Sequence, residues 1–158
     1  MDRELGQRVR ALLEIQRVAS LGTLHQGEPY VSMVPFAILP GGAGFVIHVS
    51  ALAAHTKDML ADPVVSVLVM APPAEDIPPQ ALARLTIQGE ARQIAQSEAG
   101  HVEAKGAYLA RFPDSAPMFE LGDFSLFAIR PRSLRFVGGF AQAKTLTPGG
   151  LASIFALD

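Results

Sequence analysis

The 158-residue chain contains no cysteine and no tryptophan, and it carries no excess of positive charge. The lack of cysteine excludes disulfides, thiolate zinc sites, iron–sulfur clusters and a cysteine nucleophile. Its 13 Lys and Arg residues against 15 Asp and Glu give a formal net charge of −2. No positive field therefore attracts nucleic acid or an anionic membrane, and neither is expected as a partner.

The chain also lacks a long apolar segment. Its most apolar run, from Val64 to Ala71, is far shorter than the roughly 18 residues that a membrane helix requires. The start, from Met1 to Glu4, is mixed in charge and does not resemble a secretory signal. Since roughly 150 residues is usual for one domain, we expect residues 1–158 to form a single cytoplasmic domain.

Local patterns predict helices alternating with groups of strands. Gly27 and Pro29 favour a hairpin turn between the first two strands, and the segment from Arg130 to Arg132 separates the last two. Short joins of this kind predict a mainly antiparallel α+β domain whose sheet closes into a barrel. The expected helices cover residues 2–18, 52–61 and 97–111, and the expected strands cover 21–24, 30–39, 45–50, 64–70, 83–94, 124–129 and 133–137.

Four histidines raise the question of a metal site. His25, His48, His55 and His101 fall on a turn, a strand, a helix start and a helix, and their spacing matches no metal-binding motif. The sequence also has no G-x-S-x-G elbow and no P-loop. The residues themselves therefore predict no metal centre and nominate no catalytic group.

One segment favours the binding of an anion. A strand ends at Ser50, and the next helix opens with His55, Thr56 and Lys57. Backbone N–H groups at a helix N-terminus attract an anion, and Thr56 and Lys57 add a hydroxyl donor and a positive charge, which suits a phosphate monoester. The alternative is a solvated lysine and a hydroxyl that satisfies the first turn of the helix.

Several segments in succession resemble one known family. They are PYVSMVPFA at residues 29–37, HVSALAAHTKDMLADPVVSVL at 48–68, ARLTIQGEA at 83–91 and GDFSLF at 122–127. In this order they resemble the FMN-binding split barrels related to pyridoxamine 5'-phosphate oxidase, and among these the haem-utilisation branch. The resemblance extends from Leu21 to Lys144.

This resemblance implies a six-stranded, mainly antiparallel split β-barrel with flanking helices, an N-terminal helix within residues 1–20 and a C-terminal tail at 145–158. It also implies a homodimer that binds FMN in clefts between its subunits and oxidises or reduces a small molecule. The implied cofactor-binding residues are Ser32, Met33, Val34 and Pro35 beside the flavin ring, His48, Val49 and Ser50 beside the ring and ribityl chain, His55, Thr56 and Lys57 at the phosphate, and Arg84 near the flavin or its phosphate.

Two departures from the haem-utilisation branch stand out. Its members tend to carry Gly-Phe-Gly-Arg-Ala near the end of the barrel, where this chain has Gln142 at the position of the arginine. They also often continue into a C-terminal extension that contributes to haem ligation, whereas this chain ends at Asp158. Three hypotheses follow: an FMN-dependent oxidoreductase, a haem-handling protein that uses the same cleft with His48 or His55 as a ligand, and a non-catalytic module that holds flavin or another phosphorylated molecule.

Overall fold

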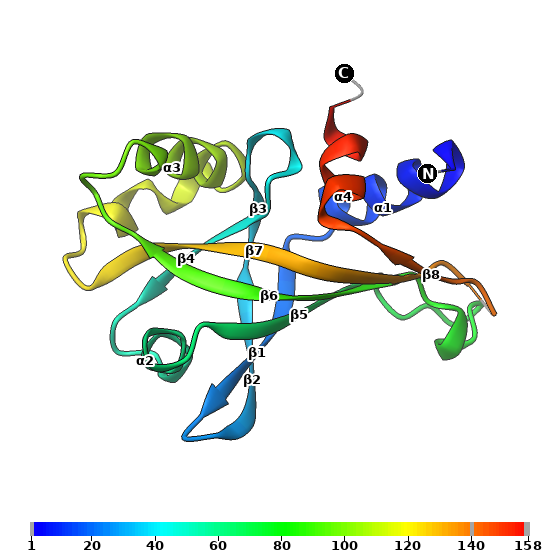
Figure 1. Ribbon diagram of the computed structural model, residues 1–158, viewed down its shortest axis with the longest axis horizontal. Helices are drawn as coiled ribbons and strands as arrows, with labels where there is room; N and C mark the ends of the chain where they lie inside the picture. Colours follow the sequence, from blue (N-terminus) through cyan, green and yellow to red (C-terminus); the bar gives the residue numbers. More distant parts are fainter. Residues whose placement is uncertain (1, 140, 157–158) are drawn as a thin grey trace.

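Residues 2–139 and 141–156 are described by the computed structural model of the chain, drawn as a ribbon in Figure 1. Within them, no helix is long and apolar enough to cross a membrane. The helices and strands are, in chain order, α1 (Arg3–Ile15), β1 (Val18–His25), β2 (Glu28–Pro35), β3 (Ala37–Ile38), the helical turn η1 (Pro40–Gly42), β4 (Phe45–Ser50), α2 (Ala54–Ala61), β5 (Val64–Met70), η2 (Pro79–Ala81), β6 (Arg84–Ile94), α3 (Gly100–Arg111), η3 (Pro113–Glu120), β7 (Phe124–Val137), β8 (Ala143–Leu146) and α4 (Pro148–Phe155).

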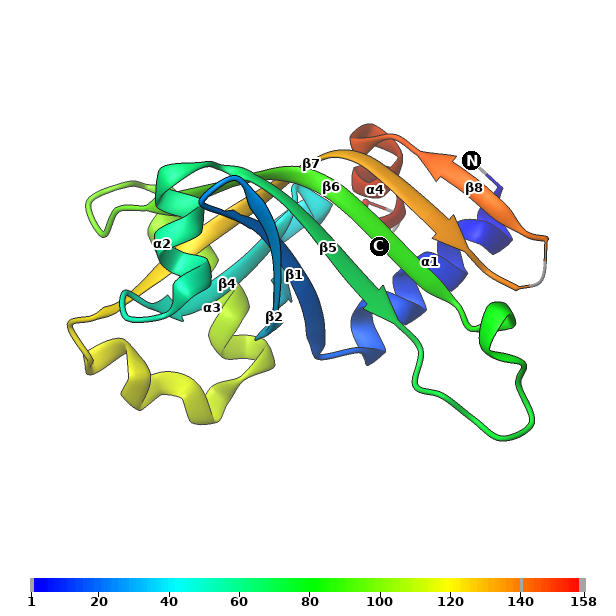
Figure 2. The ribbon, with the colours of Figure 1, turned by 90° about the horizontal axis from the view of Figure 1, so that it is seen from below.

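The strands form one antiparallel sheet. The described residues contribute eight strands, seven of them in the order β2-β1-β5-β6-β7-β4-β3, with β8 paired to β7. Six strands are at least six residues long, the number expected for the barrel, and β3 and β8 are short additions. Figures 1 and 2 show the sheet curled, with α2 and α3 toward one end and α1 and α4 toward the other.

Two apolar clusters hold these layers together. The inner faces of the strands, with Val9 and Leu13 of α1 and Leu151 of α4, form the core inside the curl. In a smaller cluster, Tyr108 of α3 packs against Val46 of β4 and against other apolar residues of the sheet. Because successive side chains of a strand point to opposite faces, the two faces of β4 serve the two clusters.

The last two predicted strands are a single strand, so the predicted join between them is wrong. Gly89 of β6 pairs with Pro131 of β7, while the residue before Gly89 pairs with Ser133. Arg132 is therefore the extra residue of a β-bulge, which bends β7 without ending it. Proline is tolerated at such a place because the ladder of hydrogen bonds is already interrupted there.

The C-terminal segment, expected as a tail from residue 145, contains the end of β8 and all of α4. The Thr147 hydroxyl accepts a hydrogen bond from the Gly150 N–H at 3.0 Å and so caps the start of α4. Leu151 and Ile154 are buried against the rest of the core. The apolar residues of this segment therefore close one end of the sheet beside α1.

Gly89 supplies a test of the bulge. A Cβ at this position would overlap the Arg130 carbonyl oxygen, so the backbone of β6 or β7 would have to move. We expect Gly89→Ala to lower the free energy of unfolding by about 1–3 kcal/mol, measured by urea denaturation. The matched control is Gly106→Ala in α3, where a Cβ meets nothing within 4 Å, and where alanine adds up to about 1 kcal/mol of helix stability. Equal stability of the two variants would contradict the bulge geometry.

Candidate functional site

A buried carboxylate joins α2 to the β1–β2 hairpin. Asp58 of α2 has only 5% of its surface exposed, and it accepts a hydrogen bond from the Thr23 hydroxyl at 2.8 Å. Its other carboxylate oxygen lies 2.7 Å from Nδ1 of His25, at the end of β1. Burial raises the pKa of a carboxyl, but the hydrogen bonds from His25 and Thr23 outweigh this effect and hold the pKa of Asp58 below its usual value. The carboxylate is therefore ionised at neutral pH.

A second polar pair lies beside this carboxylate. Nδ1 of His55, in the first turn of α2, is 3.1 Å from the Ser32 hydroxyl oxygen on β2. Burial lowers the pKa of His55, and the nearby Asp58 carboxylate only partly opposes this effect. Two residues implied as cofactor contacts, Ser32 and His55, are thus brought together by the fold. We call His25, Asp58, Thr23, His55 and Ser32 the α2 cluster.

The other two predicted phosphate-binding residues point in different directions. Thr56 is buried, with 1% of its surface exposed, and its hydroxyl forms no hydrogen bond within the described residues. Lys57 is exposed. Ala53 precedes the helix and offers no side-chain cap, so N–H groups of the first turn remain available to an anion. Lys57 and this backbone are thus open to solvent, whereas the Thr56 hydroxyl is turned into the protein.

The side chains of the segment from His48 to Ser50 do not all face the α2 cluster. His48 faces α3, and its ring stacks on Phe119 with the centroids 3.8 Å apart. Val49 points into the barrel core, and the Ser50 hydroxyl donates to the Asp123 carboxylate at 2.8 Å. Because side chains alternate along a strand, these three predicted residues lie in three different environments.

His48 lines a different pocket, of about 760 Å³, together with His101 and Lys105 of α3. Burial, with smaller contributions from these two residues, lowers the pKa of His48 to about 4. Its imidazole is therefore neutral at neutral pH. This pocket lies on the outer side of the sheet under α3, separate from the α2 cluster.

The remaining predicted residues are divided between the two faces and the two ends of the sheet. On β2, Met33 is exposed, Val34 is buried and Pro35 is half-buried. Arg84 begins β6 and donates to the carbonyl oxygen of Leu82 at 2.9 Å. It lies at the end of β6 far from α2 (Figure 2), so one copy of the chain does not bring Arg84 to the α2 cluster. The cofactor roles of all these residues stay predictions.

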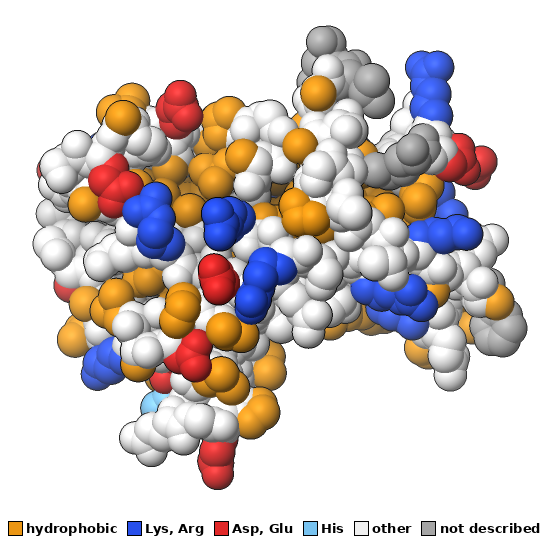
Figure 3. Space-filling model, viewed as in Figure 1, with side chains coloured by type: hydrophobic (Ala, Val, Ile, Leu, Met, Phe, Trp, Pro, Cys, Tyr) orange, Lys and Arg blue, Asp and Glu red, His pale blue; other side chains and the backbone are white. Residues whose placement is uncertain are grey.

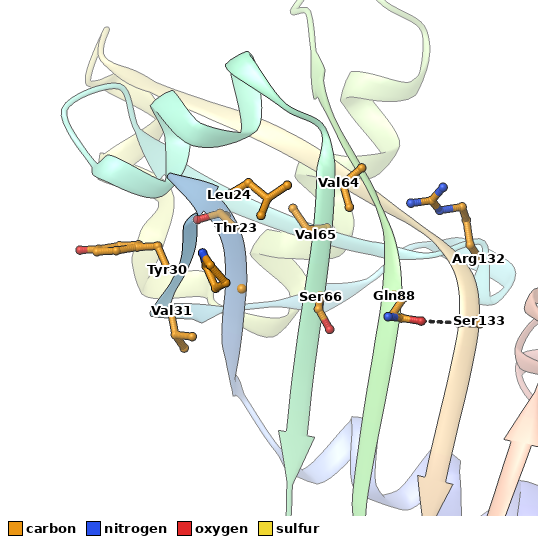
Figure 4. A pocket seen from close by; sticks show the side chains of 12 residues that line it. Thr23, Leu24, Tyr30, Val31, Val64, Val65, Ser66, Gln88, Arg132 and Ser133 are labelled. Atoms are coloured by element: carbon orange, nitrogen blue, oxygen red, sulfur yellow. Dashed lines mark hydrogen bonds between the residues drawn. The ribbon is translucent and has the colours of Figure 1, made fainter. Parts of the chain in front are cut away.

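A shallow apolar pocket lies on the outer face of the sheet, opposite the α2 cluster (Figure 4). Its volume is about 500 Å³, and it spreads over β1, β2, β5, β6 and β7. Leu24, Val31 and Val64 provide apolar surface, and Arg132 stands at its edge. Tyr30 also lines this pocket, and its ring centroid is 5.5 Å from that of His25. Figure 4 shows the Tyr30 ring pointing away from Leu24 and Val64, so the pocket lies on the outer face of the hairpin and the α2 cluster on its inner face.

Sequence reasoning missed both His25 and this pocket. His25 was expected in a turn, with no part in the cofactor site. A signal for the pocket was present in β2, where the exposed Val31 and Met33 alternate with Ser32 and Val34. Apolar residues at successive positions of an exposed strand face are typical of a surface that contacts another molecule.

The sequence from residue 5 to residue 138 matches the family model of pyridoxamine 5'-phosphate oxidase. The chain belongs to the pyridoxamine 5'-phosphate oxidase family. Its predicted family and the predicted antiparallel split-barrel fold are thereby confirmed.

Similar proteins within this family have haem in their names. The chain is 36% identical over 140 residues to the chloroplast haem oxygenase HOZ of Arabidopsis thaliana, covering 87% of this chain but only 41% of HOZ. It is 27% identical over 134 residues to the haem oxygenase HutZ of Vibrio cholerae, covering 84% of this chain and 75% of HutZ. A solved haem-binding protein from Mycobacterium smegmatis superposes with a TM-score of 0.81 at 30% identity, over 97% of this chain and 61% of that protein. These likenesses confirm the predicted haem-utilisation branch.

Gln142, which stands where that branch tends to carry arginine, has a basic neighbour. Its side-chain oxygen accepts a hydrogen bond from the Arg8 guanidinium at 3.2 Å, and Arg8 also donates to the Gly138 carbonyl. Phe140, between them in the sequence, lies outside the described residues. Arg8 of α1 thus places a positive charge at this end of the sheet, where a second arginine would be repelled.

His48 supplies a test of the pocket under α3. Its pKa is about 4 in the folded protein against 6.5 for a solvated histidine, so the unfolded chain binds the proton more readily between these values. The protein therefore loses stability as the pH falls from about 6.5 to about 4, by an amount on the order of 2–3 kcal/mol from this residue. We expect His48→Phe, which preserves the stacking on Phe119, to flatten this dependence in urea denaturation at several pH values. A part of the slope remains because the pKa of His55 is also lowered. An unchanged slope would contradict the burial of His48.

Proposed function

We propose that this protein binds haem and acts in haem utilisation as a homodimer. The observation that carries the proposal is the shallow pocket on the outer face of the sheet, where apolar side chains lie beside Arg132 (Figure 4). A porphyrin needs flat apolar contact, a polar group at its iron and cations near its carboxylates. The likeness to haem oxygenases and to a haem-binding protein supports the same ligand.

The residues of the pocket fit such a group. Leu24, Val31 and Val64 offer the apolar surface. Arg132 is half exposed and pairs only loosely with Glu90, at 3.7 Å, so it is available to a carboxylate of the ligand. When bound, haem supplies a redox-active iron whose behaviour the protein sets through an axial ligand and the polarity of the pocket.

Exposed apolar residues support the homodimer. Val31 is 68% exposed and Met33 64% exposed, both on β2, which ends the sheet. Figure 3 shows hydrophobic side chains gathered over this part of the molecule, around α2 and the β1–β2 hairpin. A second copy laid on this face would remove the patch from water and close the shallow pocket, because symmetric pairing buries the same surface on both copies.

Haemin titration of the purified protein tests this proposal. We expect a Soret band that saturates at one haemin per chain. Val31→Asp should weaken the binding about tenfold or more, because a carboxylate would be buried without a partner, and it should shift the protein toward monomer in sedimentation. The matched control is Val102→Asp on α3, where a valine is 76% exposed beside the other pocket. Loss of binding in the control alone would place the ligand under α3 and contradict the proposed site.

A flavin is the second candidate ligand, and Lys57 is the observation that favours it. Lys57 is exposed beside the uncapped start of α2, where it can meet a phosphate. If the protein binds FMN there, Lys57→Ala should weaken the affinity by about 1.5–3 kcal/mol through the loss of a charge-assisted contact. Quenching of FMN fluorescence on titration measures this change. Lys144→Ala, on β8 away from α2, is the control. If Lys57→Ala and Lys144→Ala bind FMN equally well, the phosphate does not bind at the start of α2.

A further inference from the structure

The pocket under α3 has a volume of about 760 Å³, within the range of roughly 300–1,000 Å³ that is usual for sites of small organic molecules. Its lining residues come from β4, the end of β6, the start of β7, α3 and η3. None of them lines the apolar pocket proposed for haem. The pocket is therefore a second place where a ligand can bind.

One part of the wall of this pocket is apolar and aromatic. Phe119 of η3 and Phe124 of β7 line the pocket together with Leu109 of α3. Val102 lines it as well and is largely exposed, so a bound molecule would cover it. Aromatic rings make favourable contacts with other rings through their faces and edges. These side chains therefore favour a ligand with an aromatic body.

The same wall carries a positive charge without a counter-ion. Lys105 of α3 is half-buried, and its Nζ lies 5.0 Å from the centre of the Phe119 ring. Within residues 2–139 and 141–156, Lys105 forms no salt bridge. None of the described lining residues is Asp or Glu. An anion in the pocket would supply the counter-ion, in surroundings less polar than water where opposite charges attract more strongly.

Two histidines add hydrogen-bonding groups to this wall. His101 lies four residues before Lys105, so the two side chains share one face of α3. His48 faces them from β4 and is 7% exposed, and its Nδ1 is buried without a hydrogen-bond partner in the described part of the chain. Such an atom is rare in a folded protein, because burial has cost it its water. The protein therefore leaves the polar side of this pocket incomplete.

The charge inside the pocket is positive but small. Burial lowers the pKa of His48 most, and the nearby charges of His101 and Lys105 lower it further. Glu98, in the turn before α3, lies near enough to His101 to interact with it, but it already pairs with Arg92 at 2.9 Å. A phosphate ester carries about 1.5–2 negative charges at neutral pH and would be repelled by Glu98 more strongly than a carboxylate would. A single carboxylate is the better match.

We propose that the pocket under α3 is a binding site for a small aromatic carboxylate. Its carboxylate group pairs with Lys105 and accepts a hydrogen bond from His101, and its ring lies against Phe119 and Phe124. This site shares no lining residue with the apolar pocket beside Arg132, so it does not depend on the binding of haem.

Titration of the purified protein with 2-naphthoate tests this proposal. The uncharged 2-naphthylmethanol has the same rings without the carboxylate and serves as the comparison. Because the chain has no tryptophan, the fluorescence anisotropy of the naphthalene group can be followed without its background. We expect saturable binding of 2-naphthoate, about tenfold tighter than that of 2-naphthylmethanol, because a charge-assisted contact adds to the apolar one.

Lys105→Met locates the carboxylate. Methionine keeps the apolar stem of the side chain and removes the charge, so 2-naphthoate should bind about tenfold more weakly while 2-naphthylmethanol binds as before. The unchanged binding of the alcohol also shows that the variant is folded. Arg132→Met is the matched control, because it removes a cation from the apolar pocket on the outer face, and it should bind 2-naphthoate as the wild type does.

Three outcomes would overturn the proposal. The wild type could fail to bind 2-naphthoate, or bind it no more tightly than the alcohol. Arg132→Met could lose the binding while Lys105→Met keeps it, which would place the carboxylate in the apolar pocket. Lys105→Met could weaken both compounds equally, which would show that the lysine acts through the structure of the pocket and not through its charge.

Discussion

The arrangement of the candidate site depends on one buried charge. A carboxylate without partners is costly inside a protein, and Asp58 is 5% exposed. Its two partners, Thr23 and His25, both come from β1. These two contacts hold helix α2 against the hairpin. That position also brings His55 against Ser32 and leaves Lys57 at the surface, so the polar geometry around α2 follows from the burial of a single side chain.

The two faces of the β1–β2 hairpin carry different kinds of side chains. Thr23 and Tyr30 lie opposite each other in the register of β1 and β2, on the side that meets α2. Val31 and Met33 lie on the other side, where apolar residues remain exposed. Since the side-chain period of a strand is two residues, a polar cluster and an apolar surface occupy the two opposite faces of one pair of strands.

Much of the fold was predictable because it is encoded locally. Gly27 can adopt the positive φ that the hairpin turn needs, and Pro63 ends the preceding helix, so β1, β2, α2 and β5 lie close to their expected places. The break predicted around Pro131 was wrong because a proline in a bulge and a proline in a turn have the same local signal. Only the pairing with Gly89 distinguishes them, and that pairing joins residues far apart in the sequence.

The site was less predictable than the fold. The sequence alone determined the elements, the family resemblance and the residue types available near α2, because these depend on short-range pattern and composition. The tertiary structure alone decided that His48 faces α3, that Arg84 lies at the far end of β6, and that His25 meets Asp58 across 33 positions. Contacts between distant residues depend on how strands pair and how a helix docks. No local pattern carries that information, so the carboxylate that orients His25 became visible only in the folded chain.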